Sequence, residues 1–305
     1  MPELPEVERL RQSLLPHLLA ARVINVLVHR ADVCECFESL GNADEKIGQM
    51  QLQSVAPSPE CLLAGCRIKA LYRHGKHLAI ETQEGPSLCV HLGMSGQVLV
   101  QEPTEIDREQ ALRTHTHVVW MLDQANITHG VGDQIHKIML FRDPRRFGGL
   151  WSYPSLELLR ASRWSHLGPD ALLVQGEELS RAIAGSKRAI KAALLDQSVL
   201  AGVGNIYADE SLFRAGISPR RLALRLRPDA CKRLAAMIRD VLRESIAAGG
   251  SSMRDYLDAN GKAGTSQVTH RVYGRGGAPC LSCGTLLRSA LIAQRTTVWC
   301  PKCQA

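Results

Sequence analysis

The chain has 305 residues, 45% of them hydrophobic, and no run of about 18 apolar residues, so it can form two or three domains but offers no transmembrane helix. Its first ten residues carry acids where a secretory signal carries basic residues, which predicts a cytoplasmic protein with reduced cysteines. The net charge of +7 is uneven, because residues 151–305 hold 22 Lys and Arg against 12 Asp and Glu. That basic half fits a nucleic-acid partner or a merely soluble basic surface equally well.

The N-terminal stretch "EVERLRQSLLPHLL" predicts a helix. Its apolar residues recur at helical spacing, and Pro5 suits a first helical turn. The residues on this apolar stripe are Val7, Leu10, Leu14 and Leu18.

Residues 22–153 change to short β-branched runs such as "RVINVLV", "HLAIET" and "HVVWML". These runs predict a β-rich domain of two packed sheets. Two polar, strand-poor stretches, 38–60 and 123–136, are typical of surface insertions, and we assign them no function.

After Pro154 the periodicity becomes helical, and it is clearest in "DACKRLAAMIRDVLRESIAAGG", which Gly249 and Gly250 end. A Gly- and Ser-rich segment then leads into a cysteine-bearing tail. The pattern predicts an α+β multidomain protein whose domains span residues 1–153, 154–260 and 261–305.

The tail reads C-x2-C, sixteen residues, C-x2-C, formed by Cys280, Cys283, Cys300 and Cys303. Four thiolates on two tight turns converge tetrahedrally and close a coordination shell, which predicts one structural zinc, with an iron-sulfur site as the minor alternative. The strand between the two pairs carries Arg295 near a turn. An arginine at this place either binds a phosphate or is only a solvated charge.

Three glycine-bearing segments allow nucleic-acid contacts. "GVGNIYADE" places Asn205 at a helix start, where it could clasp a phosphate or simply cap the helix. "HLGMSG" and "FRDPRRFGG" place Met94, Arg145 and Phe147 on turns. Such side chains usually pack back onto the protein, but beside a basic face they can wedge between bases.

Together these motifs resemble those of one family, the formamidopyrimidine-DNA glycosylases, bifunctional enzymes that excise oxidised purines. "MPELPEVE", "HLGMSG", "DPRRFG", "GVGNIYADE", "VYGRGG" and "AQRTTVWCPKC" occur in the family's order and span the chain. The resemblance implies an N-terminal β-sandwich, a helix-two-turn-helix domain and a C-terminal zinc-finger hairpin. It also implies damaged double-stranded DNA as partner, no membrane, a monomer, and a place at the nucleoid if the source is bacterial.

The resemblance also explains the proline behind the initiator methionine. In this family Met1 is removed, and the amine of Pro2 attacks the sugar C1′. An N-terminal amine with a pKa of about 8 is far less protonated at neutral pH than a lysine at about 10.4. Because the amine is secondary, attack gives a cationic iminium, which draws electrons and permits strand cleavage by β- and δ-elimination. Glu3 matches the acid that protonates the sugar ring oxygen, and Glu6 matches a group that holds the amine.

Further residues match the family's DNA contacts. Lys76, Arg295 and Asn205 match groups on the phosphates that flank the lesion, where the first two assist elimination. His115 and Lys187 match looser contact positions. The residues that match the fillers of the gap left by the flipped nucleotide are Met94, Arg145 and Phe147.

The loop that closes over the extruded base departs from the family's pattern. Thr265 and Ser266 stand where aromatic residues are expected, and Arg254 stands where lysine is frequent. These departures leave the preferred lesion and the opposite base open. The alternatives are an endonuclease VIII-like glycosylase for oxidised pyrimidines and a non-catalytic zinc-finger DNA-binding protein.

Overall fold

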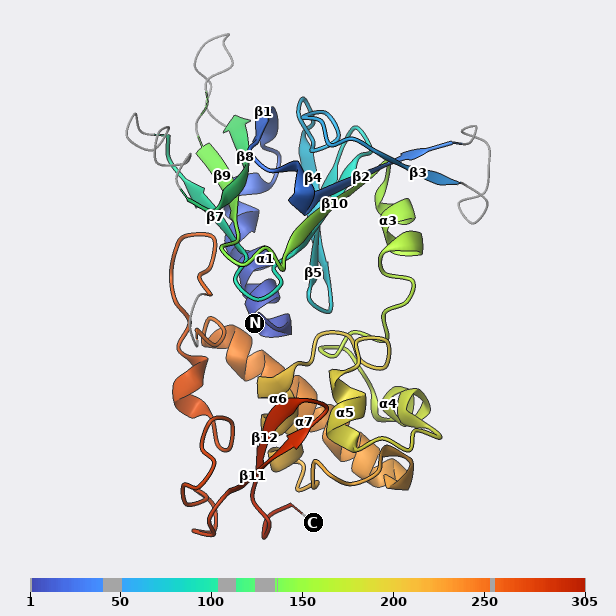
Figure 1. The fold of residues 1–305 in the computed structure, drawn as a ribbon, viewed down its shortest axis with the longest axis vertical. Coiled ribbons are helices and arrows are strands. Elements are labelled where there is room, and N and C mark those ends of the chain that lie inside the picture. Colours follow the sequence, from blue (N-terminus) through green and yellow to red (C-terminus); the bar gives the residue numbers. More distant parts are fainter. Residues whose placement is uncertain are drawn as a thin grey trace. The chain divides into compact units, whose positions relative to one another are not determined.

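The structure is a computed structural model that describes residues 2–40, 51–103, 114–123, 135, 137–252 and 256–304. The chain divides into two compact units (Figure 1). Unit 1 comprises residues 1–2, 6–165 and 252–264, and unit 2 comprises residues 3–5, 166–251 and 265–305. Met1, Arg254, residues 41–50 of the first predicted insertion and most of the second lie outside the described residues.

Helix α1 (Leu4–Leu18) confirms the predicted N-terminal helix. All four residues of its predicted apolar stripe are at most 1% exposed and pack into the core of unit 1. Trp120 and Phe141, from two neighbouring strands, fill the same core. The periodic apolar positions therefore bury one face of α1, as helical spacing requires.

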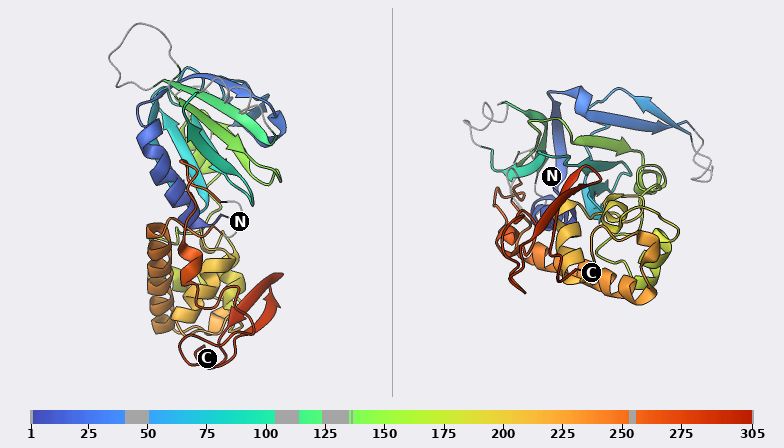
Figure 2. Two further views of the ribbon diagram at one scale, coloured as in Figure 1. Left: turned by 90° about the vertical axis from the view of Figure 1, so that its left-hand side faces the viewer. Right: turned by 60° about the horizontal axis from the view of Figure 1, so that its bottom comes forward.

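Unit 1 contains the predicted sandwich of two sheets, which Figure 2 shows from two further sides. Among the described residues, one sheet has the strand order β1-β8-β9-β7 and the other β3-β2-β10-β6-β5-β4. The strands are β1 (Arg22–Val28), β2 (Cys34–Ser39), β3 (Leu52–Val55), β4 (Ile68–His74), β5 (His77–Thr82), β6 (Ser87–His91), β7 (Gln97–Gln101), β8 (Thr116–Asp123), β9 (Lys137–Arg142) and β10 (Gly149–Tyr153).

Strand β3 lies within the stretch that the sequence indicated to be strand-poor. It pairs antiparallel with β2 at the edge of its sheet, so backbone hydrogen bonding overrides its polar composition. A 3-10 turn, η1 (Ala31–Val33), precedes β2, and helix α3 (Leu156–Ser162) follows β10.

Unit 2 contains the predicted helices. They are α4 (Gly176–Ile183), α5 (Ile190–Leu195), α6 (Asn205–Arg214) and α7 (Pro228–Ala247), with the 3-10 turns η3 (Ala223–Arg225) and η4 (Ser266–Thr269). Helix α7 begins at a proline, which suits a first helical turn. It stops before two glycines with positive φ, Gly249 and Gly250, and the sequence predicted this stop. No helix of the described residues is long and apolar enough to cross a membrane.

A hairpin of β11 (Arg288–Ile292) and β12 (Arg295–Trp299) completes unit 2, in red in Figure 2. A buried ion pair joins it to the helices. Lys191 Nζ lies 2.7 Å from Asp209 Oδ1, and the other oxygen of Asp209 accepts the N–H of Val298 at 3.0 Å. Burial lowers the pKa of Lys191 and raises that of Asp209 to about 6, and the attraction between the two charges opposes both changes.

Candidate functional site

The carboxylate of Glu3 occupies the N-terminus of α6. It is 3% exposed and accepts the backbone N–H groups of Gly204 at 2.7 Å, Ile206 at 2.9 Å and Tyr207 at 3.4 Å. A helix N-terminus has unpaired N–H groups and a positive dipole end, so a carboxylate there is stabilised. Pro2, directly before it in the chain, is buried. The donors that could have bound a phosphate at this helix end therefore bind Glu3.

The glycines of "GVGN" make room for the N-terminal residues. A Cβ on Gly204 would collide with the carboxyl carbon of Glu3, and one on Gly202 would collide with the side chain of Leu4. Gly202 also has a φ of +113°, and its carbonyl accepts the N–H of Leu4 at 3.0 Å. The glycine run is thus required by the close approach of residues 3 and 4.

Asn205, the first residue of α6, contacts the hairpin. Its side-chain amide donates to the carbonyl oxygen of Thr296 at 3.1 Å, and Lys191 Nζ lies 3.3 Å from the same oxygen. Thr296 directly follows Arg295. The structure therefore brings Asn205 next to the backbone that carries Arg295, both of which the sequence assigned to phosphate contacts.

Arg295 itself is exposed at the start of β12. The two residues before it, Ala293 and Gln294, both have positive φ, of 48° and 57°. This is the backbone that a two-residue hairpin turn needs, although neither residue is glycine. Lys187 is exposed before α5. Both cations are thus accessible on the surface of unit 2.

Helix α6 carries two further buried carboxylates, which the sequence analysis did not single out. Asp209 binds Lys191 and Val298, as described above. Glu210, 3% exposed, accepts the backbone N–H groups of residues 271–273 at 2.8 to 3.0 Å. The acids of "GVGNIYADE" therefore fix the start of "RVYGRGG" and the zinc-finger hairpin to one helix.

Three candidate catalytic residues are buried in unit 1. Pro2 is buried, Glu6 in the first turn of α1 is 1% exposed, and Lys76 is 7% exposed. Lys76 follows Gly75, whose φ of 55° makes the tight turn between β4 and β5. Burial, followed by the positive charges of Lys76 and Arg163, lowers the pKa of His91 to about 4. His91 is therefore neutral at neutral pH, and the positive charge of Lys76 contributes to this.

One buried carboxylate, Asp143, connects the turns of "HLGMSG" and "FRDPRRFGG". Its oxygens accept Ser95 Oγ at 2.6 Å and the N–H of Gly148 at 2.7 Å, and its own N–H donates to the carbonyl of His115 at 3.0 Å. Ser95 belongs to the turn of Met94, and Gly148 to that of Phe147. Asp143 thus joins the "HLGMSG" and "DPRRFG" turns to the chain at His115.

The side chains on these turns remain accessible. Met94 is 39% exposed and Phe147 is 56% exposed. The guanidinium carbon of Arg145 lies 5.1 Å from the ring centre of Phe147, within cation–π range. Asp143 fixes the base of both turns, while the side chains at their tips face solvent. Side chains that are expected to insert between bases need to be exposed in this way.

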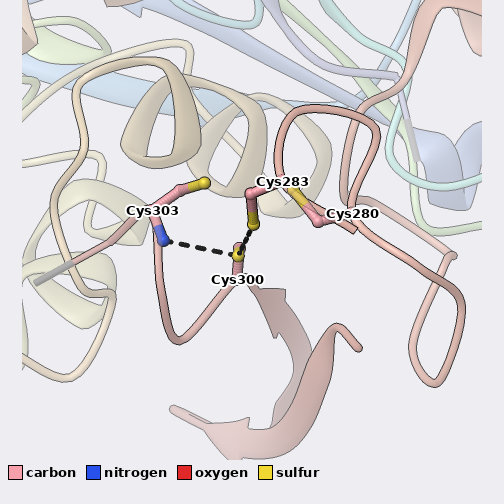
Figure 3. A group of neighbouring side chains, drawn as sticks. All are labelled: Cys280, Cys283, Cys300 and Cys303. Atoms are coloured by element: carbon pink, nitrogen blue, oxygen red, sulfur yellow. Dashed lines mark hydrogen bonds between the residues drawn. The ribbon is translucent and has the colours of Figure 1, made fainter. Parts of the chain in front are cut away.

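The four tail cysteines form a metal centre (Figure 3). Their sulfur atoms all lie within 4.8 Å of one another, and those of Cys283 and Cys300 are 3.5 Å apart. Tetrahedral zinc with Zn–S distances of about 2.3 Å sets its sulfurs about 3.8 Å apart. The donor set and its spacing fit one structural zinc, as the sequence predicted.

We expect Cys300→Ser to lose zinc. Cys300 is fully buried in a small apolar cluster with Phe213, Leu287 and Val298, which is too small to order the hairpin without the metal. The variant should therefore also bind duplex DNA more weakly, because Arg295 is on this hairpin. Metal analysis and a binding titration measure both effects. Cys61→Ser, in unit 1, should keep its zinc, and a full zinc content in Cys300→Ser would show the assignment to be wrong.

Three family models match successive parts of the chain. The formamidopyrimidine-DNA glycosylase N-terminal domain matches residues 1–150, the H2TH domain of the same glycosylases matches residues 167–256, and a zinc finger found in FPG and IleRS matches residues 277–305. Formamidopyrimidine-DNA glycosylases of Desulfitobacterium hafniense and Stenotrophomonas maltophilia are 40% and 38% identical to the chain, each aligned over 306 residues and the whole of both sequences.

Solved structures give the same result over the full length. The MutM (Fpg) protein of Thermus thermophilus is 34% identical, with a TM-score of 0.77 over 99% of this chain and 98% of that one. Lactococcus lactis Fpg in complex with abasic-site DNA is 26% identical, with a TM-score of 0.78 over 99% of each chain. Full-length relatives and all three domain models agree, and the chain belongs to the formamidopyrimidine-DNA glycosylase family.

Proposed function

We propose that the protein is a base-excision repair enzyme that removes oxidised purines, such as 8-oxoguanine and formamidopyrimidines, from duplex DNA and then cleaves the strand at the abasic site. Family membership over the whole chain supports the activity. The observation that carries the proposal in this chain is the contact of Glu3 with the N-terminus of α6. The contact buries this carboxylate and fixes it directly after Pro2 in the chain, as the proposed role of an acid next to the nucleophile requires.

In the proposed reaction, the amine of Pro2 attacks C1′ after removal of Met1, and the bond from C1′ to the base breaks. The base leaves with the electron pair of that bond and takes up the proton that the attacking amine gives up. Glu3 protonates the ring oxygen, and the ring opens to an iminium between Pro2 and the sugar. Loss of a proton from C2′ then expels the 3′ phosphate, and a second elimination expels the 5′ phosphate. Glu6 holds the amine in place. Pro2, Glu3 and Glu6 are all buried, so the surrounding protein fixes their positions, which these roles require.

Cationic and polar groups in each unit would bind the backbone around the lesion. In unit 1, Lys76 would contact a flanking phosphate and His115 a more distant one. In unit 2, Arg295 and Asn205 would share one phosphate clamp, which their link through Thr296 supports, and Lys187 would add a looser contact. One chain carries every proposed group, so we propose that the enzyme acts as a monomer, in the cytoplasm at the DNA it repairs.

Met94, Arg145 and Phe147 would fill the space left by the extruded nucleotide. Extrusion costs a few kcal/mol of stacking and pairing, which inserted side chains offset. Their common support on Asp143 favours this role, because a single buried carboxylate fixes both turns and lets them enter the duplex as one body. The domain limits proposed from the sequence, 1–153, 154–260 and 261–305, assign this wedge to the first domain and the phosphate clamp to the other two.

A product assay tests the proposed function. Duplexes that carry 8-oxoguanine should be cut faster than duplexes that carry an oxidised pyrimidine, and the product should be a gap with phosphate at both ends. Faster cutting of the pyrimidine duplex would indicate an endonuclease VIII-like enzyme, and binding without cleavage would indicate a non-catalytic protein.

Glu3→Gln should slow base excision by at least about a hundredfold, since a general acid contributes roughly 10² or more. Glu177→Gln, on the exposed surface of α4, is the matched control and should cut at the wild-type rate.

We expect Met94→Ala to separate the two steps. Excision of a paired lesion should fall by roughly tenfold, which corresponds to about 1.4 kcal/mol of lost wedging, while cleavage at a preformed abasic site should change much less. Only the first substrate needs a base pushed out of the stack. Leu19→Ala, which also removes an exposed apolar side chain of unit 1, should leave both rates unchanged. Equal losses of Met94→Ala on the two substrates would contradict the wedge.

A further inference from the structure

Residues 256–264 run beside helix α1 in unit 1 (Figures 1 and 2). Four side-chain contacts form along the helix, in order. The Tyr256 hydroxyl donates to the Glu6 carbonyl at 2.9 Å, Arg9 pairs with Asp258 at 3.2 Å, Ser13 Oγ accepts the N–H of Ala259 at 3.0 Å, and His17 Nε2 lies 2.8 Å from Asn260 Oδ1.

The helix positions in these contacts, 6, 9, 13 and 17, form one stripe at helical spacing. It differs from the apolar stripe that faces the sheets. The segment is itself well fixed, because Asp258 is 2% exposed and caps its own turn by accepting the N–H groups of Asn260 and Lys262, both at 3.0 Å. The carbonyl of Ala259 also accepts the N–H of Val100, at the neighbouring sheet. The segment is therefore a rigid support for α1.

Tyr256 makes the contact nearest to the proposed chemistry. The side chain of Tyr256 is 6% exposed, and a phenylalanine would bury the same ring. A buried hydroxyl needs a hydrogen-bond partner, and the hydroxyl of Tyr256 has one. Its partner is the backbone of Glu6, in the first turn of α1, two residues after the helix begins. Burial, and then the negative charges of Glu6 and Asp258, raise the pKa of Tyr256, so its hydroxyl keeps the proton that it donates.

We propose that Tyr256 is a positioning residue for base excision, one that sets the orientation of the first turn of α1 and hence of the Glu6 carboxylate and the Pro2 amine. The inference rests on the proposed function, in which Pro2 is the nucleophile. A nucleophile displaced by a fraction of an ångström from its line of attack loses much of its rate even when binding is intact. Tyr256 also lies nine and ten residues before Thr265 and Ser266, so the support for the nucleophile and the loop expected around the base belong to one continuous stretch of chain.

Tyr256→Phe tests the proposal, since it removes the hydroxyl and keeps the ring. The single-turnover rate constant, measured with saturating enzyme and corrected for the active fraction, should fall about five- to tenfold, as expected for one lost buried hydrogen bond. The fall should be the same on a paired lesion and on a preformed abasic site, because both need Pro2. The dissociation constant for the duplex should not change. Tyr153→Phe is the matched control, since it removes another buried hydroxyl of unit 1, bonded to Ser162, and should keep the wild-type rate.

Hydrogen exchange gives a second measurement, independent of activity. Amides of residues 4–10 should exchange faster in Tyr256→Phe than in the wild type or in Tyr153→Phe. An unchanged rate constant in Tyr256→Phe, or an equal fall in Tyr153→Phe, would overturn the positioning role. A wild-type protein that excises no base would refute the proposed function instead, while the exchange measurement would still report whether Tyr256 orders the first turn of α1.

Discussion

The structure depends most on where the carboxylate of Glu3 is bound. Three backbone N–H groups at the start of α6 donate to it. Such N–H groups have no partner within the helix and would otherwise need water or a ligand. Two glycines are required for the approach, Gly202 and Gly204. A chain terminus is ordinarily among the most mobile parts of a protein, and this contact orders the one place where the proposed nucleophile must be presented in a fixed geometry.

Helix α6 extends the same principle along its length. Asn205 binds the backbone beside Arg295, Asp209 binds the hairpin through Val298, and Glu210 binds the segment that leads to the zinc finger. These carboxylates are buried, and each is paired with backbone donors or with a buried cation, which a low-dielectric interior requires. The apolar cluster of the hairpin is small, and we expect zinc on its four cysteines to complete its order. The Glu3 carboxylate, the proposed phosphate contact at Asn205 and the segment that leads to the zinc finger are therefore all attached to one helix.

Local patterns in the sequence predicted the elements well and the long-range contacts poorly. The apolar stripe of α1, the β-branched runs, the glycine stop after α7 and the cysteine spacing each have a short-range physical cause, and all four are found in the structure. The partner of Glu3 lies about 200 residues away, and nothing near residue 3 indicates it. The hydrogen bonds from Asp143 to two separate turns were not predicted either. The Asp-Pro pair in "DPRRFG" indicates a turn, but it does not indicate the second turn that Asp143 contacts. Strand β3 formed in a polar stretch because an edge strand needs little apolar surface.

The proposed reaction depends on the secondary amine of Pro2 as its nucleophile. The most direct measurement is borohydride reduction of the enzyme on an 8-oxoguanine duplex, followed by peptide mapping of the covalent complex, for the processed protein and for a variant with one residue left in front of Pro2. We expect a crosslink at residue 2 in the processed protein. In the extended variant the nitrogen is an amide without basicity, so trapping should be lost while the duplex is still bound. Equal trapping by the two proteins, or a crosslink that maps to Lys76, would contradict this role of Pro2.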